Sequence, residues 1–121
     1  LGTTDEPERT GDAGVYIYDG LMSEMSIVDT SLFNQDSSEG YAITTGSGNG
    51  WYTYAGPPTY LISPTPGKIL VFRTRDGKFA KVEILSYYLG APENPDAFAD
   101  QSRYYTFNYV YQPNEGVTEI N

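Results

Sequence analysis

Residues 68–87 read KILVFRTRDGKFAKVEILSY, and this stretch decides the fold. Two runs of β-branched and aromatic residues flank Asp76-Gly77, a pair that favours a two-residue hairpin turn. With that turn, one face of the hairpin is almost wholly apolar and carries Ile69, Val71, Ala80, Val82 and Ile84. The half-exposed face then mixes Leu70, Phe72 and Phe79 with Thr74, Lys81 and Glu83. A shift of one residue would bring charges into the core, so we expect this register to be well specified.

The composition limits the kinds of function that the chain can perform. Its 121 residues suffice for one domain with a real core. The sequence has no cysteine and no histidine, which excludes disulfides, thiol chemistry and Ser-His catalysis. A net charge of -9 disfavours nucleic acid and anionic membranes as partners, and no apolar run is long enough for a transmembrane segment. The composition therefore disfavours cysteine and Ser-His enzymes, and the leading hypothesis below is of a protein that is not an enzyme.

The pattern along the chain predicts a mostly β fold, with antiparallel sheets or an open sandwich. We expect a flexible N-terminal segment at 1–13, one β domain at 14–112 and a polar tail at 113–121. Besides the hairpin, strands are expected at 15–18, 41–45, 51–54, 59–63 and 103–112. Residues 21–26 form a helical turn or a loop, and 26–33 a strand or an extended loop. Asn94 and Pro95 begin one short helix near 95–102.

Five segments in the second half carry a family resemblance. They are GW at 50–51, GPPTY at 56–60, VFRTRDGKFAKV at 71–82, YY at 87–88 and YYTFNY at 104–109. In order and spacing they resemble the C-terminal half of the HmuY family, secreted or lipid-anchored haem-binding proteins of Bacteroidetes-type bacteria. The first 50 residues match this family only loosely, and the chain begins at Leu1 without Met. We interpret it as a processed or N-terminally truncated member.

The resemblance implies an HmuY-like β fold with haem held between two loops. One axial ligand of the family precedes the Gly-Trp element by a distance that falls on Met22 and Met25. The other follows the tryptophan, where this chain has Tyr52 and Tyr54. Because histidine is absent, the candidate iron ligands are Met22, Met25 and Tyr54, since thioether and phenolate both ligate haem iron. The full set of candidate binding residues is Met22, Met25, Trp51, Tyr52, Tyr54 and Tyr60.

Each candidate also has a purely structural interpretation. Methionines commonly fill gaps in a core, and tyrosines in strands are commonly half-buried with a solvated hydroxyl. Trp51 is a packing anchor, a stacking platform for a sugar ring or a wall for a porphyrin. The carboxylates offer no fixed pair for a hydrolase.

The leading hypothesis is an exported, hemophore-like protein that captures haem by aromatic burial and Met or Tyr axial contact. The resemblance implies a role in iron acquisition, with haem or haemoproteins and an outer-membrane receptor as partners. It also implies a location at the cell surface, through a lipoprotein precursor, or outside the cell. The alternative is a cell-surface recognition module of the same fold that has lost haem binding.

Overall fold

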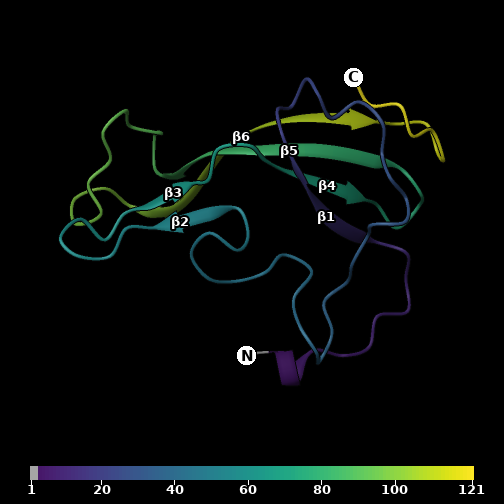
Figure 1. Ribbon diagram of the computed structural model, residues 1–121, viewed down its shortest axis with the longest axis horizontal. Helices are drawn as coiled ribbons and strands as arrows, with labels where there is room; N and C mark the ends of the chain where they lie inside the picture. The colour runs from purple at the N-terminus through teal and green to yellow at the C-terminus, as the bar shows by residue number, and fades with distance from the viewer. Residues whose placement is uncertain (1–2) are drawn as a thin grey trace.

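The computed structural model describes residues 3–121 and confirms a mostly β, antiparallel architecture. Four strands form the larger sheet in the order β1-β4-β5-β6 (Figure 1). They are β1 (Gly14–Asp19), β4 (Lys68–Arg73), β5 (Phe79–Tyr88) and β6 (Ser102–Gln112). A second sheet pairs β2 (Tyr52–Tyr54) with β3 (Ile62–Pro64). The described residues contain one 3-10 turn, η1 (Thr3–Asp5), and no α-helix.

The β4–β5 hairpin forms, but its predicted register is wrong by one residue. Val71 lies opposite Lys81 and Arg73 opposite Phe79, so the loop contains three residues, 75–77, instead of two. The Thr74 N–H donates to the Lys78 carbonyl (2.8 Å), and the Gly77 N–H donates to the Thr74 carbonyl (3.1 Å). Only Gly77 in this loop has a positive φ (78°), the signature of a type I turn followed by a bulge. The Thr74 hydroxyl fixes this loop because it donates to the Asp76 carboxylate (2.6 Å) and accepts from the Lys78 N–H (3.0 Å).

The shifted register places Lys81 in the core beside Val71. Only 2% of Lys81 is exposed. Its ammonium donates to the backbone carbonyls of Met22 (2.6 Å) and Met25 (2.7 Å). The charge that we expected to exclude this register is thus accommodated by two carbonyl acceptors of the 21–25 turn.

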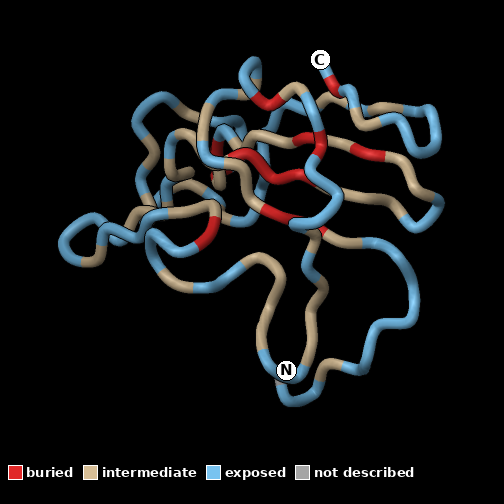
Figure 2. Tube along the Cα trace, turned by 45° about the vertical axis from the view of Figure 1, so that its right-hand side comes forward, coloured by how far each residue is buried: buried red, intermediate tan, exposed pale blue. Residues whose placement is uncertain are grey.

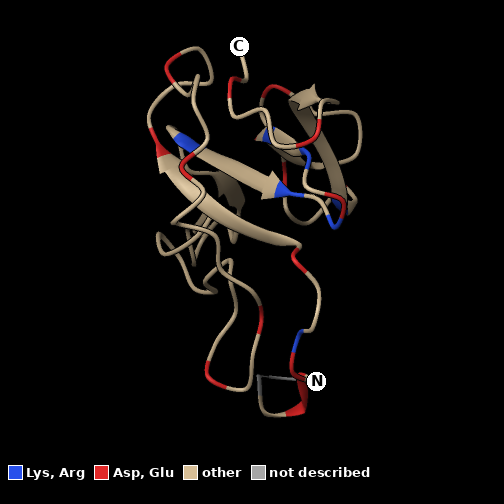
Figure 3. Ribbon diagram, turned by 90° about the vertical axis from the view of Figure 1, so that its right-hand side faces the viewer, with Lys and Arg blue, Asp and Glu red and all other residues tan. Residues whose placement is uncertain are grey.

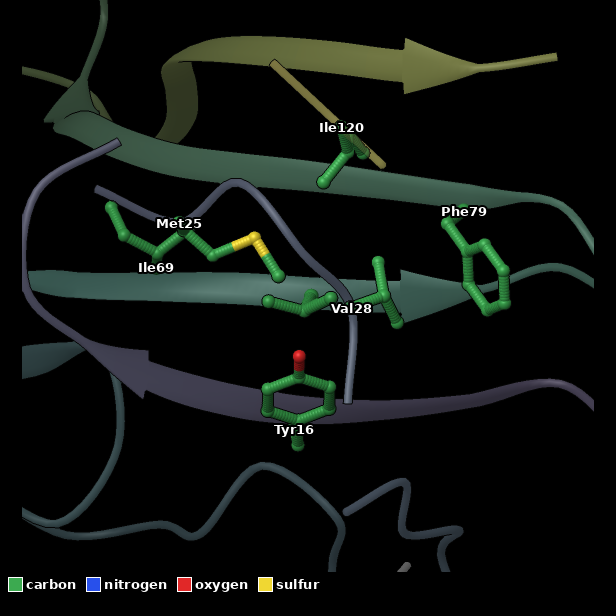
Figure 4. Close-up of a cluster of buried hydrophobic side chains, with 7 residues drawn as sticks. Tyr16, Met25, Val28, Ile69, Phe79 and Ile120 are labelled. Atoms are coloured by element: carbon green, nitrogen blue, oxygen red, sulfur yellow. The ribbon is translucent and has the colours of Figure 1, made fainter. Parts of the chain in front are cut away.

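The core lies on the face of the sheet that carries Lys81. Two segments distant in sequence, 21–28 and 117–120, cover this face and are joined by hydrogen bonds from Val28 N–H to Thr118 O (2.9 Å) and from Ile120 N–H to Ser26 O (2.8 Å). Figure 4 shows their apolar side chains gathered over the sheet, and the buried residues concentrate there (Figure 2). The buried cluster consists of Tyr16, Met25, Val28, Ile69, Val71, Phe79 and Ile120. Ile120 comes from the expected polar tail.

Two other expected elements are absent. Residues 41–45 form no strand, and the expected helix near 95–102 is a single turn, closed by a hydrogen bond from Asp100 N–H to the Asp96 carbonyl (2.8 Å). After this turn the Gln101 carbonyl accepts from Leu89 N–H (2.9 Å), and β6 begins at the next residue, Ser102.

The N-terminal segment was expected to be flexible, and Leu1 and Gly2 lie outside the described residues. Its last part is attached to the domain. The Gln35 side-chain amide donates to the carbonyls of Gly11 (2.6 Å) and Ala13 (2.7 Å), and the Arg73 guanidinium donates to the Asp12 carbonyl (2.5 Å).

Candidate functional site

Aromatic side chains gather around Trp51, the residue immediately before β2. The Trp51 ring contacts the rings of Tyr52, Tyr87 and Tyr105, with centroids 5.2–5.7 Å apart. The glycine-rich turn before Trp51 is fixed by the Tyr52 hydroxyl, which accepts from the Gly46 N–H (2.9 Å). This cluster therefore joins the small sheet to β5 and β6.

Two loops extend from this end of the molecule. In the loop between β2 and β3, the Tyr60 N–H donates to the Gly56 carbonyl (2.7 Å). The Ile62 N–H then donates to the hydroxyl of buried Tyr88 (3.0 Å), which ties β3 to β5. The loop between β5 and β6 contains the single turn at 96–100, in which the Asp96 carboxylate accepts from the Phe98 N–H (2.8 Å). The Phe98 side chain is 76% exposed.

A groove of about 340 Å³ lies between these loops. The Tyr60 and Phe98 rings meet there edge to face, with centroids 5.6 Å apart. The groove is lined by Tyr60, Ile62, Tyr87, Tyr88, Phe98 and Arg103, among others. A second hollow of about 290 Å³ shares Ala97 and Phe98 with it. The walls are therefore aromatic, with one cation at the edge.

Arg103 is the free cation of this groove. Its guanidinium makes no hydrogen bond or ion pair with the residues that the structure describes. Arg103 (φ 68°) and Tyr60 (φ 55°) are also two of the three non-glycine residues with positive φ in residues 3–121. Such costly backbone conformations cluster at functional sites, which singles out this groove.

The two candidate methionines lie elsewhere, over the core face of the sheet. Met25 is 1% exposed, and Met22 packs against the same cluster. Lys81 lies on the core face and pairs with Val110 on β6. Side chains alternate between the two faces along a strand, so Tyr105, five residues from Val110, lies on the opposite face. The segment that contains Met22 and Met25 crosses the four-stranded sheet, whereas β2 and β3 lie at one end of it, where β5 ends and β6 begins (Figure 1). The structure thus does not bring the methionines together with Trp51 and Tyr54.

The remaining candidates differ in how accessible their hydroxyls are. The Tyr52 hydroxyl is engaged by Gly46, while the side chains of Tyr54 and Tyr60 are exposed. Burial against its neighbours raises the pKa of Tyr105, and the nearby Tyr87 phenol adds to this effect, so Tyr105 is a poor source of phenolate. Tyr60 alone among the six predicted residues lines the groove between the two loops.

Sequence reasoning missed Phe98 and Arg103. Phe98 was assigned to a short helix, and Arg103 to the start of a strand. The sequence did single out Arg103, because it is the only charged residue between Asp100 and Glu115. That isolation does not show that Arg103 lies beside the loop that contains Tyr60.

No protein-family model and no curated protein matches this sequence. Within residues 3–121, no three Asp or Glu residues come together as a metal site, and no helix is long and apolar enough to cross a membrane.

Proposed function

We propose that this protein binds haem without catalysing a reaction, and that the ligand lies in the groove between the β2–β3 and β5–β6 loops. The observation that carries the proposal is the joint presence of Tyr60, Phe98 and an unpaired Arg103 around one groove. The motif resemblance supports the same ligand class. On the same resemblance we also propose an HmuY-like fold, export to the cell surface or out of the cell, and an outer-membrane receptor as partner.

The chemistry of the groove fits a flat, anionic ring system. The exposed faces of Tyr60 and Phe98 offer apolar area to a planar macrocycle. The Arg103 guanidinium suits a carboxylate, because its planar array of donors forms charge-assisted pairs. Haem has both features, as an aromatic macrocycle with two propionates.

Tyr60 is the axial candidate that the geometry favours. A tyrosine phenolate is an established haem ligand, and Tyr60 is exposed in the groove. Ligation by Met25 would require its thioether to leave the core, which would forfeit the burial of a complete side chain. We therefore replace the methionines by Tyr60 as the leading candidate, with Tyr54 as the other exposed phenol.

A haemin titration followed by Soret absorbance tests the proposal. We expect a saturable spectral shift in the wild type, a changed spectrum in Tyr60→Phe and weaker binding in Arg103→Gln. Met22→Leu is the matched control and should keep the wild-type spectrum, while Tyr54→Phe tests the other exposed phenol and should change the spectrum less than Tyr60→Phe. Absence of a saturable shift in the wild type would refute haem binding, and a spectrum altered by Met22→Leu alone would return the ligand role to methionine.

A second candidate function is that of a cell-surface recognition module without haem. The observation that favours it is the continuation of the Trp51 cluster, through half-exposed Tyr105, onto the aromatic surface of β6. This function predicts no haemin binding, but capture of a glycan or protein that is lost in Trp51→Ala. A glycan array and a pull-down with both proteins would distinguish the two functions.

A further inference from the structure

Strand β6 is a free edge of the four-stranded sheet. It is the longest strand, with 11 residues, and its only partner in the sheet is β5. Its pairing with β5 is regular from Phe79↔Gln112 to Ile84↔Phe107. The opposite edge is different, because residue Asn34 forms a two-bonded bridge with Val15 on β1. The edge of β6 thus presents regularly spaced backbone donors and acceptors.

Most of β6 lacks the usual protection of an edge strand; only its first part carries a charge, Arg103, and pairs irregularly with β5 between residues 102 and 107. Natural edges carry lysine, proline, inward-pointing charges or a covering segment, which prevent pairing with another chain. Residues 104–112 contain no charge and no proline. Four aromatic side chains share one face at alternating positions and are 46–65% exposed: Tyr105, Phe107, Tyr109 and Tyr111.

Charge distribution indicates which partner this edge can accept. The chain has a net charge of -9, and its acidic residues lie mainly in loops (Figure 3). In the strands only Asp19 and Glu83 are acidic. Two copies joined along β6 would keep their Glu83 residues three strand spacings apart, about 14 Å. That distance exceeds the screening length of about 8 Å at physiological salt, so this edge allows self-association despite the net charge.

We propose that β6 pairs with β6 of a second copy of this chain, antiparallel, to form one continuous eight-stranded sheet. A two-fold axis normal to the sheet keeps the aromatic faces on the same side, and such isologous interfaces are the commonest in homo-oligomers. With the axis beside Asn108, Phe107 lies opposite Tyr109 and Tyr105 opposite Tyr111 of the other copy. Directly opposed aromatic pairs stabilise antiparallel strands, and this register contains four.

Sedimentation velocity over a range of concentrations tests the proposal on the whole chain. The wild type should convert reversibly from 13.4 kDa to twice that mass. Tyr109→Glu should weaken the dimer at least about tenfold, the equivalent of about 1.4 kcal/mol, because two aromatic pairs are lost and negative charge is added. Leu21→Glu changes an equally exposed apolar residue outside β6 and should dimerise like the wild type.

A cysteine scan tests the register. Because the chain has no cysteine, Asn108→Cys places a single thiol beside the proposed axis, and mild oxidation should give a disulfide-linked dimer. Leu21→Cys should stay monomeric under the same conditions. The proposal is overturned if the wild type sediments as a monomer up to millimolar concentration, or if it forms open-ended assemblies. Equal dimerisation of Tyr109→Glu and the wild type would also overturn it.

Discussion

The core face of the sheet and the end of the molecule around Tyr60 and Phe98 differ in an unexpected way: the core face contains a charge, and the loops at the end expose aromatic rings. The core face contains a lysine ammonium that donates to two carbonyls, while the loop end keeps Phe98 and several tyrosines in solvent. The difference has a physical origin. The turn at 21–25 needs donors for its carbonyls, and Lys81 supplies them, so a charge is stable there. The rings of Tyr60 and Phe98 contact each other but remain exposed, which is why we assign binding to them.

The largest effect on stability should come from Met25. Met25→Ala removes most of a fully buried side chain and leaves a cavity among Ile69, Val71 and Ile120. We expect the free energy of unfolding to fall by about 2–5 kcal/mol, measured by urea denaturation. Ile27→Ala, two residues away and 67% exposed, should change it by less than about 0.5 kcal/mol. Similar values for the two variants would contradict the placement of Met25 in the core.

The next effect concerns the buried ammonium. Lys81→Met keeps the length of the side chain but removes the donors to the Met22 and Met25 carbonyls. Unpaired carbonyls in the core should lower the free energy of unfolding by about 1–3 kcal/mol. Lys78→Met is the matched control, because Lys78 pairs with Asp76 in solvent, and its effect should be smaller. A Lys81→Met variant more stable than the wild type would show that desolvation of the charge outweighs its hydrogen bonds.

Lys81 should also make stability depend on alkaline pH. Burial lowers the pKa of Lys81 below 10.5 in the folded state. Between that lowered pKa and 10.5 the unfolded chain binds more protons, so the free energy of unfolding rises with pH across this window. Burial raises the pKa of Tyr16 above 10.0, so the free energy of unfolding falls at higher pH as this phenol titrates. This decrease is common to the wild type and Lys81→Met. The stability difference between the wild type and Lys81→Met should therefore widen as the pH rises through this window in urea titrations, and a constant difference would contradict this prediction.

A smaller effect is expected at Gly77, where the hairpin register is decided. Gly77 has a φ of 78°, and a Cβ added there would lie 3.3 Å from Cγ of Glu115. Gly77→Ala should cost about 1–2 kcal/mol, because L-residues are strained in the left-handed region. Gly77→Asn should cost less, since asparagine tolerates that region. Equal loss in both variants would point to the contact with Glu115, and not to backbone strain, as the cause.

The same hairpin shows how far sequence could predict this fold. The strands at β1, β4, β5 and β6 follow from local alternation and from turns rich in glycine or proline, and they are confirmed. The register failed because Asp76-Gly77 suits both a two-residue and a three-residue loop. The Thr74 hydroxyl decides between them through contacts that no periodicity reveals. The core contacts of Met25 and Ile120 likewise depend on segments far apart in sequence.

The candidate site was less predictable than the fold. Tyr60 could be found because it belongs to a segment, GPPTY at 56–60, that the sequence singled out, but its neighbours Phe98 and Arg103 belong to another loop. Their approach depends on the length of β5 and on where the 96–100 turn ends. A pattern within one segment carries no information about such an approach. Sequence reasoning therefore found one wall of the groove, but two of its three candidate iron ligands, Met22 and Met25, lie over the core face of the sheet.

The last prediction separates the two regions by function instead of stability. Phe98→Ala removes a ring that is 76% exposed, so the free energy of unfolding should change by less than about 0.5 kcal/mol. Haemin binding should weaken about two- to tenfold, since one aromatic contact contributes about 0.5–1.5 kcal/mol. Leu89→Ala is the control, because Leu89 is exposed in the same loop but does not line either hollow. If both variants bind haemin equally, the groove between the loops is not the site. If Phe98→Ala also lowers the free energy of unfolding, the Phe98 ring supports the loops, and the two regions differ less in function than we infer.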